Sequence, residues 1–66
     1  MKIGILSIDN WEGLYVDGKL KLEGHSLQLE EVLKILFVDV EVNYSDDDLE
    51  KFDYHCPDTW TKAKKL

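Results

Sequence analysis

The alternation of apolar and polar residues along this chain predicts four short strands. Residues 2–9 carry apolar side chains on both of their alternating faces, as a strand in the middle of a sheet does. Residues 11–23 form a predicted hairpin, because Asp17-Gly18 tolerates positive φ and separates two short runs. Residues 38–44 alternate strictly between apolar and polar side chains, which predicts a half-buried strand.

The hairpin has two alternative registers. A two-residue turn places Tyr15 opposite Leu20, whereas a three-residue turn with a glycine bulge places Leu14 opposite Leu20. The bulged turn gathers Leu14, Leu20 and Leu22 on one dry face of the hairpin. We favour the bulged turn for that reason.

Residues 27–37 predict an amphipathic helix, for which Ser26 is a suitable N-cap. The apolar positions that recur at helical spacing are Leu29, Val32, Leu33 and Leu36. Glu30 and Lys34 add a favourable ion pair one turn apart, worth about 0.3 kcal/mol. The order of elements predicts an α+β fold, with a small antiparallel sheet (β-β-β-α-β) and this amphipathic helix packed on one face.

The last third of the chain differs in composition. Ser45 followed by three aspartates predicts the start of a short helix that runs to about Phe52, and Pro57 then interrupts the chain. A further helical turn is predicted to begin at Asp58-Thr59-Trp60. We therefore expect a single domain, residues 1–66, with its core in about 1–44 and an acidic, aromatic and partly helical C-terminal segment at 45–66.

A chain of 66 residues has little interior with which to stabilise a fold. A core of this size rarely supplies more than about 3–5 kcal/mol without a disulfide, a metal or self-association. Cys56 is the single cysteine, so an intramolecular disulfide is excluded, and a homodimer is the expected remedy. Residues 1–8 do not resemble a signal peptide, and no apolar run is long enough for a membrane span, so we expect a cytoplasmic protein.

The charge of the chain narrows the choice of partner. Fourteen acidic residues against eight basic ones give a formal net charge of −6. Direct binding to nucleic acid requires the opposite sign, because contacts with phosphates dominate its affinity. A basic protein surface is the expected partner instead, and the acidic charge would accelerate the encounter. A plainer interpretation is that the charge only keeps a small protein in solution.

The residues that could carry chemistry are too few or badly spaced. Three consecutive aspartates, 46–48, point to different sides of a starting helix and do not converge on a metal ion. His25, His55 and Cys56 fall one ligand short of a structural zinc site within one chain. A domain of this size also leaves little room for a substrate pocket of about 300–1,000 Å³. We expect no catalytic residues, no metal, no cofactor and no enzymatic activity.

Aromatic residues are frequent for such a short chain, and several stand outside the periodic elements. Tyrosine and tryptophan are enriched at interface hot spots, although a small core also needs its large side chains. The residues predicted to form a protein-binding surface or a dimer interface are Trp11, Tyr15, Tyr44, Asp47, Phe52, Tyr54 and Trp60.

Residues 11–20 (WEGLYVDGKL) and 23–27 (EGHSL) carry a resemblance that covers about half of the chain. They resemble very short acidic proteins encoded by phages and prophages of Bacillus-like hosts. Some proteins of that kind are anti-defence factors, and the chain looks like the Hachiman anti-defence type, a small homodimeric inhibitor. Nothing from residue 45 onward matches this group, so the resemblance implies no partner residues there.

Charge, size and resemblance together predict a phage-encoded inhibitor that binds a host defence protein stoichiometrically in the cytoplasm of the host cell. One alternative is an acidic DNA mimic, in which Asp39, Glu41 and the acids of residues 46–53 imitate phosphates and occupy a nucleic-acid site. A second alternative is a structural or regulatory phage protein that acts by self-assembly.

Overall fold

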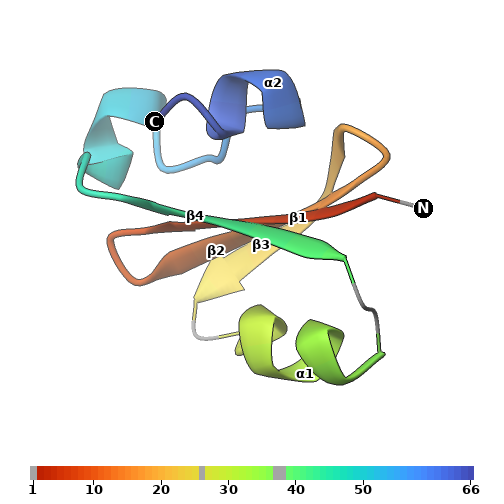
Figure 1. Ribbon diagram of the computed structural model, residues 1–66. Coiled ribbons are helices and arrows are strands. Elements are labelled where there is room, and N and C mark those ends of the chain that lie inside the picture. Colours follow the sequence, from red (N-terminus) through yellow and green to blue (C-terminus); the bar gives the residue numbers. More distant parts are fainter. Residues whose placement is uncertain (1, 26, 37–38) are drawn as a thin grey trace.

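The chain folds into a four-stranded sheet with helical segments on both faces (Figure 1). The structure, a computed structural model, describes residues 2–25, 27–36 and 39–66. In chain order the elements are β1 (Ile3–Ile8), β2 (Trp11–Val16), β3 (Lys19–His25), α1 (Leu29–Leu36), β4 (Val40–Ser45), the 3-10 helix η1 (Leu49–Phe52) and α2 (Trp60–Ala63). Figure 1 shows α1 below the sheet and the segment that contains η1 and α2 above it.

The sheet is mixed, with strand order β3-β2-β1-β4. The α+β class and the order of elements agree with the sequence-based prediction, but an antiparallel arrangement holds only for β1, β2 and β3, since β4 pairs with β1 in parallel. Two hairpins reverse the chain twice, so β3 runs in the same direction as β1. The connection through α1 then returns the chain across the sheet, and β4 starts in that same direction.

Both hairpins close with two-residue turns. Ile8 pairs with Trp11 across Asp9-Asn10, and Val16 pairs with Lys19 across Asp17-Gly18. All four turn residues have positive φ, between 48° and 88°. Turns of this kind match the right-handed twist of the strands, which explains why Asp, Asn and Gly occupy these positions.

The favoured register of the second hairpin is wrong. Tyr15 lies opposite Leu20, as a two-residue turn requires, and the irregularity falls later, between Leu14 and Tyr15. At this point β3 contains one extra residue, so Leu14 pairs with Leu22. The side chains of Leu20 and Leu22 therefore point to opposite sides of the sheet. Leu20 packs against the C-terminal segment, and its role in that core outweighs the simple alternation on which the prediction depended.

Strand β1 is central and covered on both faces, as its pattern predicted. Ile3 and Ile5 face one side, and Leu6 and Ile8 face the other, and all four are buried. A buried side chain of this size contributes about 1.5–3 kcal/mol. The remaining elements can be understood as the cover that these two faces of β1 require.

Helix α1 covers one face and begins two residues later than predicted. The Glu12 carboxylate of β2 accepts hydrogen bonds from the backbone N–H groups of Gln28 and Leu29, at 2.9 and 3.1 Å. This distant side chain satisfies two of the donors that the first turn of a helix leaves free. The predicted N-cap Ser26, the helix end at Phe37 and the strand start at Val38 lie outside the described residues.

The C-terminal segment covers the other face. Ser45 ends β4, and its Oγ accepts a hydrogen bond from the Asp47 backbone N–H at 3.1 Å, so the predicted helix start at Ser45 is wrong: η1 begins at Leu49. The turn predicted at residues 58–60 is α2. Buried residues of this segment join the core, which therefore extends beyond residues 1–44; they are Leu49, Cys56 and Ala63. Within the described residues, no helix is long and apolar enough to cross a membrane.

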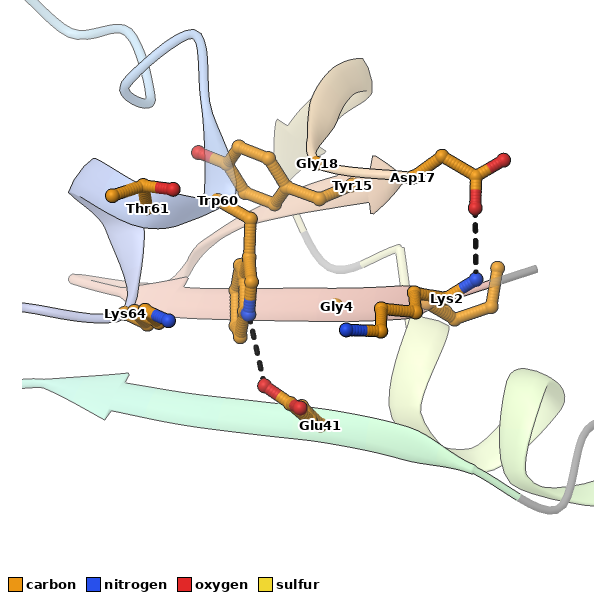
Figure 2. A pocket seen from close by; sticks show the side chains of 10 residues that line it. Lys2, Gly4, Tyr15, Asp17, Gly18, Glu41, Trp60, Thr61 and Lys64 are labelled. Carbon is orange, nitrogen blue, oxygen red and sulfur yellow. Dashed lines mark hydrogen bonds between the residues drawn. The ribbon is translucent and has the colours of Figure 1, made fainter.

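Gly4 allows α2 to approach β1 closely. The indole of Trp60 lies against Gly4, as Figure 2 shows, and a Cβ at Gly4 would meet three of its ring carbons at 2.7–2.9 Å. Gly13 plays the same part for Cys56, whose Sγ would lie 2.8 Å from an added Cβ. Glycine in a strand costs intrinsic stability, and here it is compensated by the packing that it permits.

Replacing Gly4 with alanine should destabilise the fold by about 1–3 kcal/mol, because the rigid indole cannot yield to the new methyl group. Chemical unfolding followed by circular dichroism measures this. Gly24→Ala is the matched control, since its nearest neighbour would be a flexible Leu27 methyl group at 3.4 Å, and it should change stability by less than about 0.5 kcal/mol. Equal effects of the two variants would contradict the packing described.

Candidate functional site

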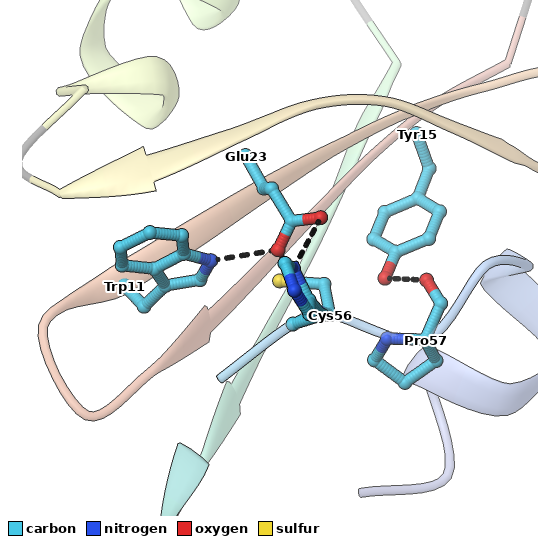
Figure 3. Close-up of polar contacts among 6 residues, drawn as sticks. Trp11, Tyr15, Glu23, Cys56 and Pro57 are labelled. Carbon is cyan, nitrogen blue, oxygen red and sulfur yellow. Dashed lines mark hydrogen bonds and ion pairs between the residues drawn. The ribbon is translucent and has the colours of Figure 1, made fainter. Parts of the chain in front are cut away.

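A carboxylate on β3 holds the C-terminal segment against the sheet (Figure 3). Glu23 accepts hydrogen bonds from the Trp11 indole N–H at 3.0 Å and from the Cys56 backbone N–H at 2.8 Å. The His55 Nδ1 lies 3.7 Å from the same carboxylate. Hydrogen bonds to a charged acceptor are among the stronger ones, so Glu23 is a structural junction between β2, β3 and residues 55–56.

Tyr15 is part of this packing and is not available to a partner. Its ring is buried, and its hydroxyl donates a 2.6 Å hydrogen bond to the Pro57 carbonyl. Burial, followed by the nearby Cys56 and Glu23, raises the pKa of Tyr15 well above its usual value of 10.0. The hydroxyl therefore stays protonated and serves as a fixed donor.

The Cys56 thiol is held in its protonated form. Burial, and then the adjacent Glu23 carboxylate, raises its pKa from the usual 9.0 to about 12. The thiolate is the form that attacks electrophiles and binds metals, and it is scarce here at neutral pH. A buried, protonated thiol facing Gly13 has a packing role.

The two histidines are held apart by different contacts. The His25 ring lies edge-on to Trp11, with centroids 4.7 Å apart, and its Nδ1 is 3.3 Å from the Asn10 carbonyl. His55 is instead beside Glu23 and mostly exposed. Across residues 2–25, 27–36 and 39–66, no three or more histidine, cysteine, aspartate or glutamate side chains are placed to hold a metal ion.

A cleft of about 400 Å³ opens beside Trp60 (Figure 2), so the expectation that a domain of this size leaves little room for a pocket is wrong. The charged groups along it are Lys2, Asp17, Glu41 and Lys64. Glu41 accepts a 2.9 Å hydrogen bond from the Trp60 indole N–H. Two ammonium groups and two carboxylates balance each other along this cleft, so it favours no one sign of ligand charge.

The predicted interface residues do not form one surface. Those that pack against the core are Trp11, Tyr15, Phe52 and Trp60. Tyr44 and Tyr54 are exposed, but Tyr44 points to the side of α1 and Tyr54 follows η1 on the other side of the sheet. Asp47 is half-buried beside η1, with Lys51 at 3.8 Å. Most of the aromatic surplus therefore closes the core.

The face of the sheet toward α1 carries an apolar row that crosses all four strands. Leu22 lies opposite Leu14, Leu14 opposite Ile5, and Ile5 opposite Val42. Ile5 is 1% exposed, whereas Leu22 at the β3 end of the row is 49% exposed. Cover on this face is therefore complete over β1 and incomplete over β3.

Helix α1 leaves much of its own apolar side in solvent. Val32 is 51% exposed, Ile35 85% and Leu36 67%, although Val32 and Leu36 belong to the predicted apolar stripe. Leu29 is buried and Leu33 half-buried, so only part of that stripe meets the sheet. Exposed apolar residues that gather on one side of a protein often mark an interaction site. We call Leu14, Leu22, Val32 and Ile35 the open apolar surface.

A hydrogen bond fixes the opposite flank of α1. The Tyr44 hydroxyl on β4 donates to the Glu30 carboxylate, which also pairs with Lys34 at 2.8 Å, as the sequence predicted. These hydrogen bonds, that of Lys34 first, lower the pKa of Glu30. Among the strands, β4 also has the most extensive contact with α1. The first turn of α1 is therefore held between Glu12 on β2 and Tyr44 on β4, which places it over β1.

Comparisons of this chain with protein-family models, with curated proteins and with solved structures found no match in any of the three. The candidate site is therefore defined by its geometry. Reasoning from the sequence missed the open apolar surface, because helical periodicity shows which residues share a face and not whether anything covers that face. Ile35, outside the predicted stripe, was the available signal: it is an apolar residue on a flank that the sheet does not reach.

The raised pKa of Cys56 predicts a loss of stability in alkaline solution. The stability from this group is fully present below pH 9, the usual thiol pKa, and is lost as the pH rises toward about 12, because only the unfolded chain releases the proton easily. Urea unfolding between pH 8 and 11 measures the decline. Cys56→Ala should lose stability less steeply over this range, and parallel curves for the two proteins would contradict the assignment.

Proposed function

We propose that this protein acts by binding another protein and not by catalysis, as a phage-encoded inhibitor of a host defence protein in the host cytoplasm. The observation that carries this proposal is the open apolar surface, where four apolar side chains from β2, β3 and α1 lie on one side of the sheet with incomplete cover. An inhibitor of this kind needs a stable surface and a fast encounter, and it needs no active site.

The charge of the chain supports the same function. A net charge of −6 on 66 residues attracts basic surfaces over distances of about one Debye length, roughly 8 Å at physiological ionic strength. Such attraction increases the rate of association with a basic target more than it increases affinity. The apolar contact would then supply the affinity.

The state of the reactive groups also favours binding over catalysis. Cys56 is buried and protonated, and the Tyr15 hydroxyl is committed to Pro57. The Glu23 carboxylate receives two hydrogen bonds from the protein itself. These groups contribute to the fold, and their contacts leave them unsuited to act on a substrate.

A DNA mimic is the second candidate, and the edge strand β4 favours it. Glu41 is exposed on β4, Asp39 directly precedes this strand, and Asp46 and Asp48 follow it, all three likewise exposed. The acids therefore line one edge of the sheet, where a nucleic-acid-binding protein could take them for phosphates.

Inhibition of a host defence complex should be stoichiometric: activity should fall to zero near equimolar inhibitor, and the two proteins should co-elute. Purified defence complexes titrated with the protein provide the measurement. The salt dependence of binding separates the two candidates, because a DNA mimic should lose affinity steeply as salt increases, whereas binding through the open apolar surface should lose little. The absence of both co-elution and inhibition across the candidate systems would contradict the defence inhibitor and the DNA mimic alike.

We further propose that the protein is a homodimer, because a single core of this size is marginal by itself. Static light scattering at micromolar concentration should give about twice the chain mass of 7.7 kDa. A uniform monomer would contradict both the dimer and the alternative of a self-assembling phage protein, and large assemblies would favour that alternative.

A further inference from the structure

The side of the sheet that faces α1 is wider than one helix can cover. Four strands at a spacing of about 4.8 Å span roughly 14 Å between the outer two, before side chains are added. An α-helix with its side chains is about 10–12 Å across. One helix therefore leaves part of this side of the sheet uncovered.

Hydrogen bonds from two strands place the first turn of α1 over β1, because Glu12 on β2 accepts from the backbone N–H groups of its start and Tyr44 on β4 donates to Glu30. The bond from Tyr44 directs the Glu30 flank of α1 toward β4, the edge strand next to β1. Successive residues of a helix are turned by about 100°, so Val32 and Ile35 lie roughly 200° and 140° around the helix from Glu30. Both therefore point away from β4: Val32 is turned toward the side of β2 and β3, and Ile35 lies between Val32 and the outward-facing Glu31 around the helix. On the side of β2 and β3, the sheet presents Leu14 and the 49% exposed Leu22.

The open apolar surface is thus a corner, with a floor from β2 and β3 and one wall from α1. A second helix lying beside α1 would touch the floor and the wall at once. Helices that pack side by side lie 8–10 Å apart, about two strand spacings, so a helix beside α1 would lie over β3 and the adjoining side of β2.

A second copy of this chain does not supply that helix. Among the described residues, η1 and α2 have four residues each, which is too few for a two-turn helix. Of the described helices, only α1, with eight residues, is longer than two turns. Helix α1 itself is already seated through Leu29 and Glu30. The part of α1 that faces away from the sheet carries the exposed polar residues Glu31 and Lys34 beside Ile35, and packing it on an apolar floor would bury these two charged groups.

We propose that the open apolar surface binds an amphipathic helix of the partner protein, laid beside α1 across β2 and β3. This inference depends on the proposed function and names the part of the target that is recognised. The apolar stripe of the bound helix contacts Leu14, Leu22, Val32 and Ile35. Exposed Glu31 borders the surface on the α1 side and exposed Lys19 on the β3 side. The fitting helix has basic residues along the edge next to α1, in agreement with a chain of net charge −6.

A synthetic peptide tests this surface without the natural target. The probe is an amphipathic leucine–lysine helix of about 14 residues, roughly four turns, and its control is a scrambled peptide of equal composition without the apolar stripe. Isothermal titration should show binding of the probe and none of the scrambled peptide. Equal binding of the two peptides would mean simple charge attraction and would overturn the inference.

Two variants with the same change of charge locate the binding. Ile35→Glu should weaken probe binding by about tenfold or more, since it places a charge in the apolar contact. Tyr54→Glu, on the other side of the sheet, should bind as the unaltered protein does. Both positions are exposed, so both variants should fold, which thermal unfolding checks. The added negative charge alone would strengthen attraction to a basic peptide, so weaker binding by Ile35→Glu is specific evidence. Equal binding by the two variants would overturn the inference.

The same variants separate this inference from the proposed function. If a defence complex is inhibited equally by Ile35→Glu and Tyr54→Glu, the function stands and the proposed surface is wrong. If the probe binds as expected and no defence complex is inhibited, the surface stands and the function is wrong. A change from dimer to monomer in Ile35→Glu alone would show that a second copy occupies the surface, and would overturn the partner helix.

Discussion

The structure depends on the burial of β1 on both of its faces. A strand with apolar side chains on both sides cannot be left in a sheet with one wet face, so the chain must provide two covers from only 66 residues. Residues 49–66 cover the face of β1 that carries Leu6 and Ile8, and α1 covers the opposite face. The first cover is tight, because Gly4 and Gly13 admit Trp60 and Cys56 to van der Waals contact with the sheet. The second is incomplete.

This difference between the faces connects fold with function. On the side of the C-terminal segment, the polar and aromatic side chains form hydrogen bonds within the protein. Glu23 accepts from Trp11 and from the Cys56 backbone, and Tyr15 donates to the Pro57 carbonyl. On the side of α1, Ile35 and its apolar neighbours Val32 and Leu22 are exposed. The side of α1 is therefore the one that we propose for recognition, while most of the aromatic side chains lie on the other side and pack against the core.

Local patterns predicted the elements well and their long-range arrangement less well. The central position of β1, the place of the turn at Asp17-Gly18 and the start of α2 depend on nearby residues, and they were predicted. The parallel direction of β4 follows from the crossover through α1, but its pairing with β1 at the far edge of the sheet is a long-range choice that no local pattern records. The register of the second hairpin was misjudged because Leu20 serves the core on the opposite side from Leu22. The exposure of Ile35 was missed because amphipathicity does not reveal the width of the sheet.

The most direct test of this asymmetry is the solvent exposure of individual methyl groups in solution. A soluble gadolinium chelate broadens the NMR signals of methyl groups that it can approach. The Ile35 and Leu22 methyl signals should broaden strongly, while those of Leu6 and Ala63, buried between the sheet and the C-terminal segment, should stay sharp. Protection of the Ile35 methyl groups equal to that of Leu6 would contradict the open apolar surface.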